Sequence, residues 1–189
     1  LNRYPNIVKY LGVIKKAAAV ANYETGKISK EIYEGIVKGC DDVIAGKYND
    51  QFPVDVIQGG AGTSTNMNAN EVIANLALEY MGHEPGQYEF CSPNDHVNGS
   101  QSTNDAYPCA VHLAMYADHL EMVKHLDMLI ESLEKKAEEY KNIIKMGRTQ
   151  LQDAVPMTLG LTFKAFAQSM KNEKEHLLEA AKELLYSNM

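Results

Sequence analysis

The sequence predicts an all-α fold, with an N-terminal helical domain followed by the first long helices of a central helical bundle. Three observations lead to this prediction. Apolar residues recur every three or four positions, which is the period of an amphipathic helix. Residues 109–146 contain neither glycine nor proline. The same apolar spacing returns in the last 30 or so residues, roughly the length of a second long helix.

Bulk composition fits a globular protein with a sizeable core. The chain has 189 residues, of which 45% are hydrophobic and 23% charged. A net charge of −7 without a Lys/Arg block argues against a nucleic acid or an acidic membrane as partner. No apolar stretch approaches the roughly 20 residues that cross a bilayer. The three cysteines show no CxxC spacing, so we expect reduced thiols and a cytoplasmic protein.

Two amphipathic helices are expected first. Residues 5–22 place one apolar face at Ile7, Leu11, Ile14, Ala18 and Ala21. A second helix begins near Ser29 and carries Ile32, Ile36, Cys40 and Ile44 on one face. Gly46 then provides a plausible stop, since glycine readily adopts the left-handed conformation that ends many helices.

A break and a third helix follow. Residues 51–70 lose the helical period, and Pro53, Gly59, Gly60 and Gly62 indicate extended chain and tight turns. The third helix points Val72, Leu76 and Tyr80 inward and ends at Gly82. Residues 82–99 are expected to form a loop.

Beyond Pro108 the pattern predicts two long antiparallel helices joined across residues 146–156. The first is on the order of 45 Å long or more at ~1.5 Å per residue. Its apolar positions are Leu113, Tyr116, Leu120, Val123, Leu126, Ile130, Leu133, Ala137 and Tyr140, and those of the second are Leu159, Phe163, Phe166, Met170, Leu177, Ala181 and Leu184. Two helices are half of a four-helix bundle, so other sequence or other subunits must cover their open faces. We therefore place an N-terminal domain at 1–104 and the bundle segment at 105–189.

Two polar segments share one pattern. "QSTNDAYP" at 101–108 and "GRTQLQDAVP" at 147–156 both place a hydroxyl and an amide before Asp-Ala-x-Pro. Asp105 and Asp153 suit N-terminal caps or first-turn charges of the following helix. Pro108 and Pro156 suit its first turn, where a missing N–H costs nothing.

More hydroxyls and amides are present than a cap needs. A cap requires one acceptor, which leaves Ser102, Thr103 and Asn104 in one segment, and Thr149 and Gln150 in the other, without an assigned role. A third cluster at 59–66 includes Thr63 before a helix. Neutral donors beside helix N-termini predict an anion site, for example for a dicarboxylate or a developing enolate. The alternative is that these segments are plain loops and caps.

Metal and cofactor sites are not expected. The six histidines form neither an HExxH nor a His-x-x-x-His pattern. The glycine-rich "GGAGTS" lacks the lysine and the spacing of a phosphate-binding loop. Activation by a divalent cation cannot be read from the sequence.

The motifs "AGTSTNMNANEVIANLALE", "SPNDHVNGSQSTNDAYP" and "KMGRTQLQDAVPMTLG" resemble those of the aspartase/fumarase superfamily, in the same order. The resemblance covers essentially the whole chain and implies that it is the N-terminal part of a longer subunit. It also implies a homotetramer whose active sites combine motifs from three subunits. Thr103, Ala106, Tyr107 and Gln150 favour the aspartase branch, which interconverts L-aspartate and fumarate, over the fumarase branch.

The resemblance further assigns roles to individual residues. Ser102, Thr103 and Asn104 would surround the carboxylate that takes up charge. Thr63, Thr149 and Gln150 would bind the substrate. Asn94 and Asp95 match a peripheral second anion site, although Ser92 stands where the family usually has histidine.

Two features depart from the family pattern. The segment that carries the family's general-base serine and a carboxylate-binding lysine does not occur in the 189 residues. Leu161 and Thr162 replace a usually polar pair. Fumarate hydratase and a non-catalytic helical assembly module remain as alternative functions, and the 189 residues alone are expected to be inactive.

Overall fold

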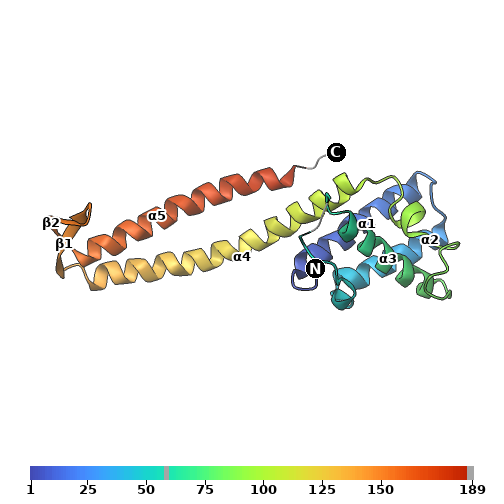
Figure 1. The fold of residues 1–189 in the computed structure, drawn as a ribbon, viewed down its shortest axis with the longest axis horizontal. Helices are drawn as coiled ribbons and strands as arrows, with labels where there is room; N and C mark the ends of the chain where they lie inside the picture. Colours follow the sequence, from blue (N-terminus) through green and yellow to red (C-terminus); the bar gives the residue numbers. More distant parts are fainter. Residues whose placement is uncertain (58–59, 187–189) are drawn as a thin grey trace. The chain divides into compact units, whose positions relative to one another are not determined.

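The computed structural model describes residues 1–57 and 60–186. Contacts within the chain divide it into two compact units. The first unit comprises residues 1–117 with those from Leu184 onward, and the second comprises 118–183. Nearly all regular structure is helical, which confirms the all-α prediction, and one two-stranded sheet is added to it (Figure 1). The proposed domain boundary after residue 104 stays a prediction.

The first unit is built around three helices. These are α1 (Pro5–Glu24), α2 (Lys30–Ile44) and α3 (Thr63–Tyr80), and α2 packs against both of the others. The short helices η1 (Asn49–Gln51) and η2 (Pro93–Val97) lie in the connections, and α4 (Thr103–Glu139) begins in this unit. Its core includes side chains with no exposed surface: Val8, Leu11, Ile36, Phe52 and Ile73.

The second helix agrees with the sequence prediction at both ends. Ser29 is the N-cap of α2, and its Oγ accepts a hydrogen bond from the Ile32 amide at 3.3 Å. Gly46 follows the last turn with a φ of 77°, a left-handed conformation that costs glycine little. Ile36 and Cys40 are fully buried, as the apolar spacing predicts.

The buried face of α1 differs from the predicted one. Leu11 is buried as expected, whereas Ala21 is exposed and Ile7 and Ile14 are only partly buried. Two polar residues, Lys15 and Asn22, are among the residues that α1 buries. Apolar spacing alone misplaces the buried face of a helix when some of the buried residues are polar.

The third helix begins earlier than predicted. Residues 63–70 are helical, although the sequence places them in the irregular segment. Tyr80 is 47% exposed rather than inward, because its hydroxyl reaches the Asp42 carboxylate at 2.5 Å. The predicted loop 82–99 contains η2. Gly59 and the helical reading of the chain up to Met189 lie outside the described residues.

The second unit is an antiparallel helix pair capped by a hairpin. The α4 residues from 118 onward pack along α5 (Leu159–Ala180), which is followed by η3 (Ala181–Leu185). Ion pairs join Glu134 to Lys171 at 2.5 Å and Asp127 to Lys174 at 2.6 Å, an order that confirms the antiparallel arrangement.

The connection between these helices is where the structure corrects the sequence most. Strands β1 (Ile144–Thr149) and β2 (Gln152–Thr158) form an antiparallel hairpin with an irregular register at Gly147. Asp153 and Pro156, predicted to start the next helix, lie in β2 instead. The helix begins only at Leu159, because Thr158 accepts the Leu161 amide at 3.1 Å as its N-cap.

Large apolar side chains remain exposed along this helix pair, as two helices cannot bury all their faces. Met128, Leu129 and Phe166 are 63%, 48% and 54% exposed. Ile130 and Ala167 are buried. The open faces expected from the sequence are therefore present in the described residues of the second unit.

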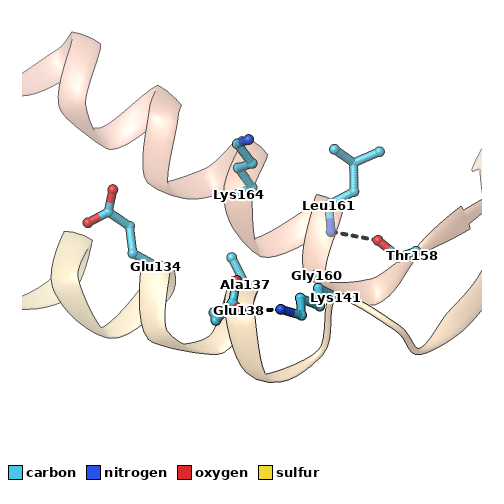
Figure 2. A pocket seen from close by; sticks show the side chains of 8 residues that line it. All are labelled: Glu134, Ala137, Glu138, Lys141, Thr158, Gly160, Leu161 and Lys164. Carbon is cyan, nitrogen blue, oxygen red and sulfur yellow. Dashed lines mark hydrogen bonds and ion pairs between the residues drawn. The ribbon is translucent and has the colours of Figure 1, made fainter.

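The junction of α4 and α5 predicts one stability effect. A Cβ at Gly160 would lie 2.4 Å from the Ala137 carbonyl oxygen and 2.7 Å from the Lys141 backbone (Figure 2). Backbone atoms cannot yield as side chains do, so Gly160→Ala is expected to lower the free energy of unfolding by about 1–3 kcal/mol. Urea unfolding measures this loss. Ser169→Ala, at an exposed position of the same helix, is the control, and equal stability of the two variants would contradict the prediction.

Candidate functional site

The segment before α4 combines a helix cap with further polar groups. Ser102 Oγ accepts the Asn104 amide at 3.2 Å, and an Asp105 carboxylate oxygen accepts the Ser102 amide at 3.0 Å. This reciprocal pair is a capping arrangement, so the prediction for Asp105 is confirmed. The Ser102 oxygen already serves the cap, and Ser102 is therefore not surplus to it as the sequence suggests. Pro108 lies in the second turn of α4 rather than in the first.

Thr103 is oriented by an amide from α3. Its Oγ1 accepts a hydrogen bond from Asn66 Nδ2 at 3.0 Å. A threonine hydroxyl has one proton and two acceptor lone pairs, so this bond leaves the proton of Thr103 for another acceptor. Thr103 is half-buried, whereas Ser102 and Asn104 are exposed. The geometry gives Thr103 the character of a fixed hydrogen-bond donor.

A buried lysine lies beneath this segment. Lys15 has no exposed surface, and its Nζ donates to Asn98 Oδ1 at 2.9 Å and to Gln101 Oε1 at 3.0 Å. Asn98 Oδ1 also accepts from Asn66 Nδ2 at 3.0 Å. Burial lowers the pKa of Lys15 from its ordinary 10.5 to about 7.

Two further hydrogen bonds hold Gly99 and Ser100 to α1. Asn22 Nδ2 donates to the Gly99 carbonyl at 2.8 Å, and Ser100 Oγ donates to Asn22 Oδ1 at 2.8 Å. Ser100 has a φ of 61°, a conformation that costs free energy in a residue with a Cβ. Side-chain bonds from α1 therefore hold the turn that leads into Ser102.

The loop before α3 lies against the start of α4. Gly62 has a φ of 81°, and a Cβ there would fall 2.3 Å from Cδ1 of Tyr107. Thr63 is the first residue of α3 and is exposed. Through Gly62 and Asn66, the structure brings the segment that contains Thr63 to the segment that contains Thr103.

Thr149 and Gln150 belong to the second unit. They lie at the tip of the hairpin, where Thr149 pairs with Gln152. Gln150 and Leu151 form the turn with φ values of 52° and 62°. A two-residue turn with both φ values positive favours Asn and Gly, so Gln150 and Leu151 hold it under strain. Their part in a common site with Thr103 stays a prediction.

Asn94 and Asp95 lie in η2 and are exposed. Ser92 Oγ accepts the Asp95 amide at 3.1 Å and donates to the Asp95 carboxylate at 2.9 Å. These bonds show a local cap in which Asp95 places negative charge at the helix start. The second anion site remains a prediction that this charge does not favour.

A separate hollow of about 390 Å³ opens between α4 and α5 near the hairpin (Figure 2). Glu134, Lys141 and Lys164 line it together with Leu161, one of the two residues that depart from the family pattern. Lys141 pairs with Glu138 at its edge. No predicted site residue lines this hollow.

Sequence reasoning missed the residues that support the Thr103 segment. Lys15 and Asn66 are buried and Asn98 and Gln101 are partly buried, and none of the four was assigned a role. A signal was available for Lys15, since Leu11, Lys15 and Ala19 follow one another every four residues along a helix. A charged residue inside an apolar stripe indicates a buried polar contact.

No cluster of three or more His, Cys, Asp or Glu side chains within 1–57 and 60–186 could hold a metal ion. No helix in those ranges is long and apolar enough to cross a membrane. Cys40, Cys91 and Cys109 are free thiols.

Comparison with known proteins gives consistent matches along the chain. A protein-family model described as lyase matches residues 3–189. The aspartate ammonia-lyase of Helicobacter pylori strain J99 is 55% identical over 177 residues, or 94% of this chain and 38% of that protein. The aspartate ammonia-lyase of Escherichia coli K12 is 52% identical over 186 residues, or 98% of this chain and 39% of that protein.

Solved structures also match. The native crystal structure of fumarate lyase:delta crystallin from Brucella melitensis gives a TM-score of 0.93 at 50% identity, over 100% of this chain and 44% of that one. A class II fumarase from Schistosoma mansoni gives 0.87 at 35% identity, over 97% of this chain and 38% of that one. The chain thus spans less than half the length of each of these relatives.

The pKa of Lys15 predicts a pH dependence of stability. Between about pH 7 and 10.5 the unfolded state binds more protons than the folded state, so the free energy of unfolding rises with pH. The slope is at most about 1.4 kcal/mol per pH unit. Burial raises the pKa of the Cys40 and Cys91 thiols, so their ionisation in the unfolded state opposes this rise as the pH approaches 8.5, and does so equally in each variant. Urea unfolding at several pH values from 7 to about 8.5 measures the slope, which Lys15→Met should lower and Lys16→Met should keep.

The strained hairpin turn predicts a stabilising substitution. Leu151 is 97% exposed with a positive φ, so Leu151→Gly removes backbone strain without losing buried area. We expect a gain of roughly 0.5–1 kcal/mol in the stability of the second unit, measured by urea unfolding. Leu151→Ala removes the same apolar side chain but keeps the Cβ, and should show no gain. A gain of the same size in both variants would exclude backbone strain as the cause.

Proposed function

The chain belongs to the aspartase/fumarase superfamily of lyases, and from this premise we propose that the full-length protein is an aspartate ammonia-lyase. The observation that carries the proposal is the identity of 51–55% with several aspartate ammonia-lyases over nearly the whole chain. The class II fumarase is 35% identical. The substrate would be L-aspartate and the products fumarate and ammonia.

The proposed reaction develops charge on a carboxylate. A base removes a proton from the carbon next to that carboxylate, and the electron pair moves into it as an enediolate. The pair then returns to form the double bond while the neighbouring C–N bond breaks and ammonia leaves. Stabilising the enediolate requires hydrogen-bond donors that are already in place when the charge appears. The proposal assigns the general base to no residue of this chain.

Thr103 is the donor that the geometry supports best. The bond from Asn66 fixes its oxygen and leaves its proton for the substrate. Ser102 and Asn104 stand beside it at the N-terminus of α4, where the helix dipole favours negative charge. In this proposal Thr103 binds the charged carboxylate directly. Ser102 contributes to the cap, and the exposed Asn104 side chain lies next to both.

The remaining predicted residues would hold the rest of the substrate. Thr63 opens α3 beside the Thr103 segment, joined to it through Asn66. Thr149 and Gln150 project from a hairpin tip and would contact a carboxylate or the amino group. Metal or cofactor participation is not part of the proposed chemistry.

We also propose a homotetramer located in the cytoplasm. The exposed apolar side chains along α4 and α5 in the second unit support further subunit contacts, because large exposed apolar surfaces usually mark interfaces. Three free cysteines are compatible with a reducing compartment.

A direct test substitutes Thr103 in the full-length protein. Thr103→Ala should reduce kcat by about 10²–10³, corresponding to about 2.7–4 kcal/mol of transition-state stabilisation. Fumarate formation from L-aspartate, followed by ultraviolet absorbance, measures the rate. Ser29→Ala removes the N-cap hydroxyl of α2, which bonds to the Ile32 amide and to none of the proposed site residues, and should cost about 1 kcal/mol of stability with turnover unchanged.

The same assay separates the alternatives. A wild-type protein that converts L-malate but not L-aspartate would be a fumarate hydratase. A protein that is folded and inactive on both substrates would support the assembly-module alternative. Thr103→Ala with wild-type turnover would remove Thr103 from the proposed mechanism.

A further inference from the structure

Lys15 is a buried amine without a carboxylate partner. Its Nζ is fully enclosed on α1, and both of its acceptors, Asn98 Oδ1 and Gln101 Oε1, are neutral amide oxygens. Within the described residues no ion pair joins Lys15 to an acid. Its neighbour Lys16, in contrast, is half-exposed and pairs with Asp41 at 2.6 Å.

Stability alone does not account for this lysine. Burial of an amine loses its hydration, and neutral amide oxygens replace that hydration only in part. Leu11 and Ala19, one turn before and one turn after, are apolar and buried. An apolar side chain at position 15 would continue their stripe without that cost, as replacements of buried ionic groups often show. What the amine does provide is two directed hydrogen bonds.

Both bonds end in the segment that leads to Thr103. Gln101 also donates from Nε2 to the Val97 carbonyl at 2.9 Å, so its side chain bridges the two ends of the turn 97–101. Asn98 donates from Nδ2 to the Gln101 carbonyl at 3.2 Å. Lys15 therefore holds the two amides that shape residues 97–101.

The same contacts extend to the Thr103 hydroxyl. Asn98 Oδ1 accepts from Lys15 and from Asn66 Nδ2, and Asn66 Nδ2 also donates to Thr103 Oγ1 at 3.0 Å. Asn98 Oδ1 thus fixes the rotamer of Asn66. The Asn66 amide in turn occupies one acceptor position of the Thr103 hydroxyl oxygen. Lys15 is three hydrogen bonds away from the hydroxyl proton and touches no substrate.

We propose that Lys15 is a positioning residue of the lyase reaction, which acts through Asn98 and Asn66 to aim the Thr103 hydroxyl at the substrate carboxylate. The inference rests on the proposed function, since that function gives Thr103 its role. Displacement of a donor by even 1 Å reduces turnover strongly, although the displaced residue still binds in the ground state. Loss of Lys15 should therefore lower kcat more than it raises KM.

The test is a double-mutant cycle in the full-length protein with L-aspartate. Lys15→Met keeps the length and apolar stem of the side chain and removes the donor. We expect it to lower kcat about 100-fold with KM changed less than about threefold. Lys15→Met combined with Thr103→Ala should be no slower than Thr103→Ala alone, because Lys15 acts through that hydroxyl. Lys16→Met, which loses only a surface ion pair, is the matched control and should retain wild-type turnover.

Two results overturn the proposal. One is a folded Lys15→Met protein with wild-type kcat. The other is a double variant whose losses multiply, since independent losses would mean that Lys15 does not act through Thr103. If Lys15→Met does not fold, Lys15→Gln, which keeps an amide donor one bond shorter, takes its place in the cycle. A kcat loss of about tenfold that Thr103→Ala masks then supports the proposal, and multiplying losses overturn it.

Failure of the proposed function is visible separately. A wild-type protein that does not consume L-aspartate overturns the function and the catalytic part of the inference together. Amide hydrogen exchange then decides the structural part. Exchange in residues 99–104 that is faster in Lys15→Met than in Lys16→Met supports the fixing of this segment by Lys15, and equal exchange overturns it.

Discussion

The first unit depends on one constraint, which is that the polar groups buried between α1, α3 and the start of α4 need hydrogen-bond partners. The Lys15 amine and the side-chain amide nitrogens of Asn22 and Asn66 have such partners, whereas Asn66 Oδ1 is buried without one. Lys15 and Asn22 enter this region from α1, and Asn66 enters it from α3. Their partners come from the irregular residues 98–102 and from Thr103, the first residue of α4. An unpaired buried donor or acceptor costs more free energy of folding than a typical hydrogen bond contributes. The backbone path of this segment is therefore tightly specified. A segment without regular structure thereby becomes rigid enough to present a donor.

This constraint also separates two functions that lie side by side in the sequence. Ser102 and Asp105 satisfy each other's backbone amides and begin α4, which is a structural task. Thr103 is outside that pair and bonds to α3 instead. A cap alone would fix the helix axis and leave the hydroxyl of the next residue free to rotate. The second contact, from Asn66, is what turns a helix start into an oriented donor.

Much of the fold could be predicted from the sequence, because apolar period and capping chemistry are local signals. Ser29 and Gly46 bound α2 as their residue types require. The hairpin at 144–158 could not be predicted in this way, since Asp153-Ala-Val-Pro156 repeats the pattern that opens α4 at Asp105. The difference lies in Thr158, which provides a later cap and leaves the preceding residues to pair as strands. For the site, hydroxyl-rich segments were recognisable. Their support by Lys15 and the three amides depends on contacts between residues up to 86 positions apart, which a periodic pattern does not contain.

The two groups of proposed substrate-binding residues are held in different ways. Thr103 is fixed by hydrogen bonds that run through Asn66 and Asn98 to Lys15. Gln150, in contrast, lies at an exposed hairpin tip with a strained backbone. Strain of this kind persists where surrounding structure or a ligand determines the conformation. The neighbouring Leu151 is 97% exposed, so the side chains of the second unit do not cover the turn. A strained and exposed turn of this kind would be stabilised by contact with another protein surface. This agrees with the proposal that other subunits help to build the site.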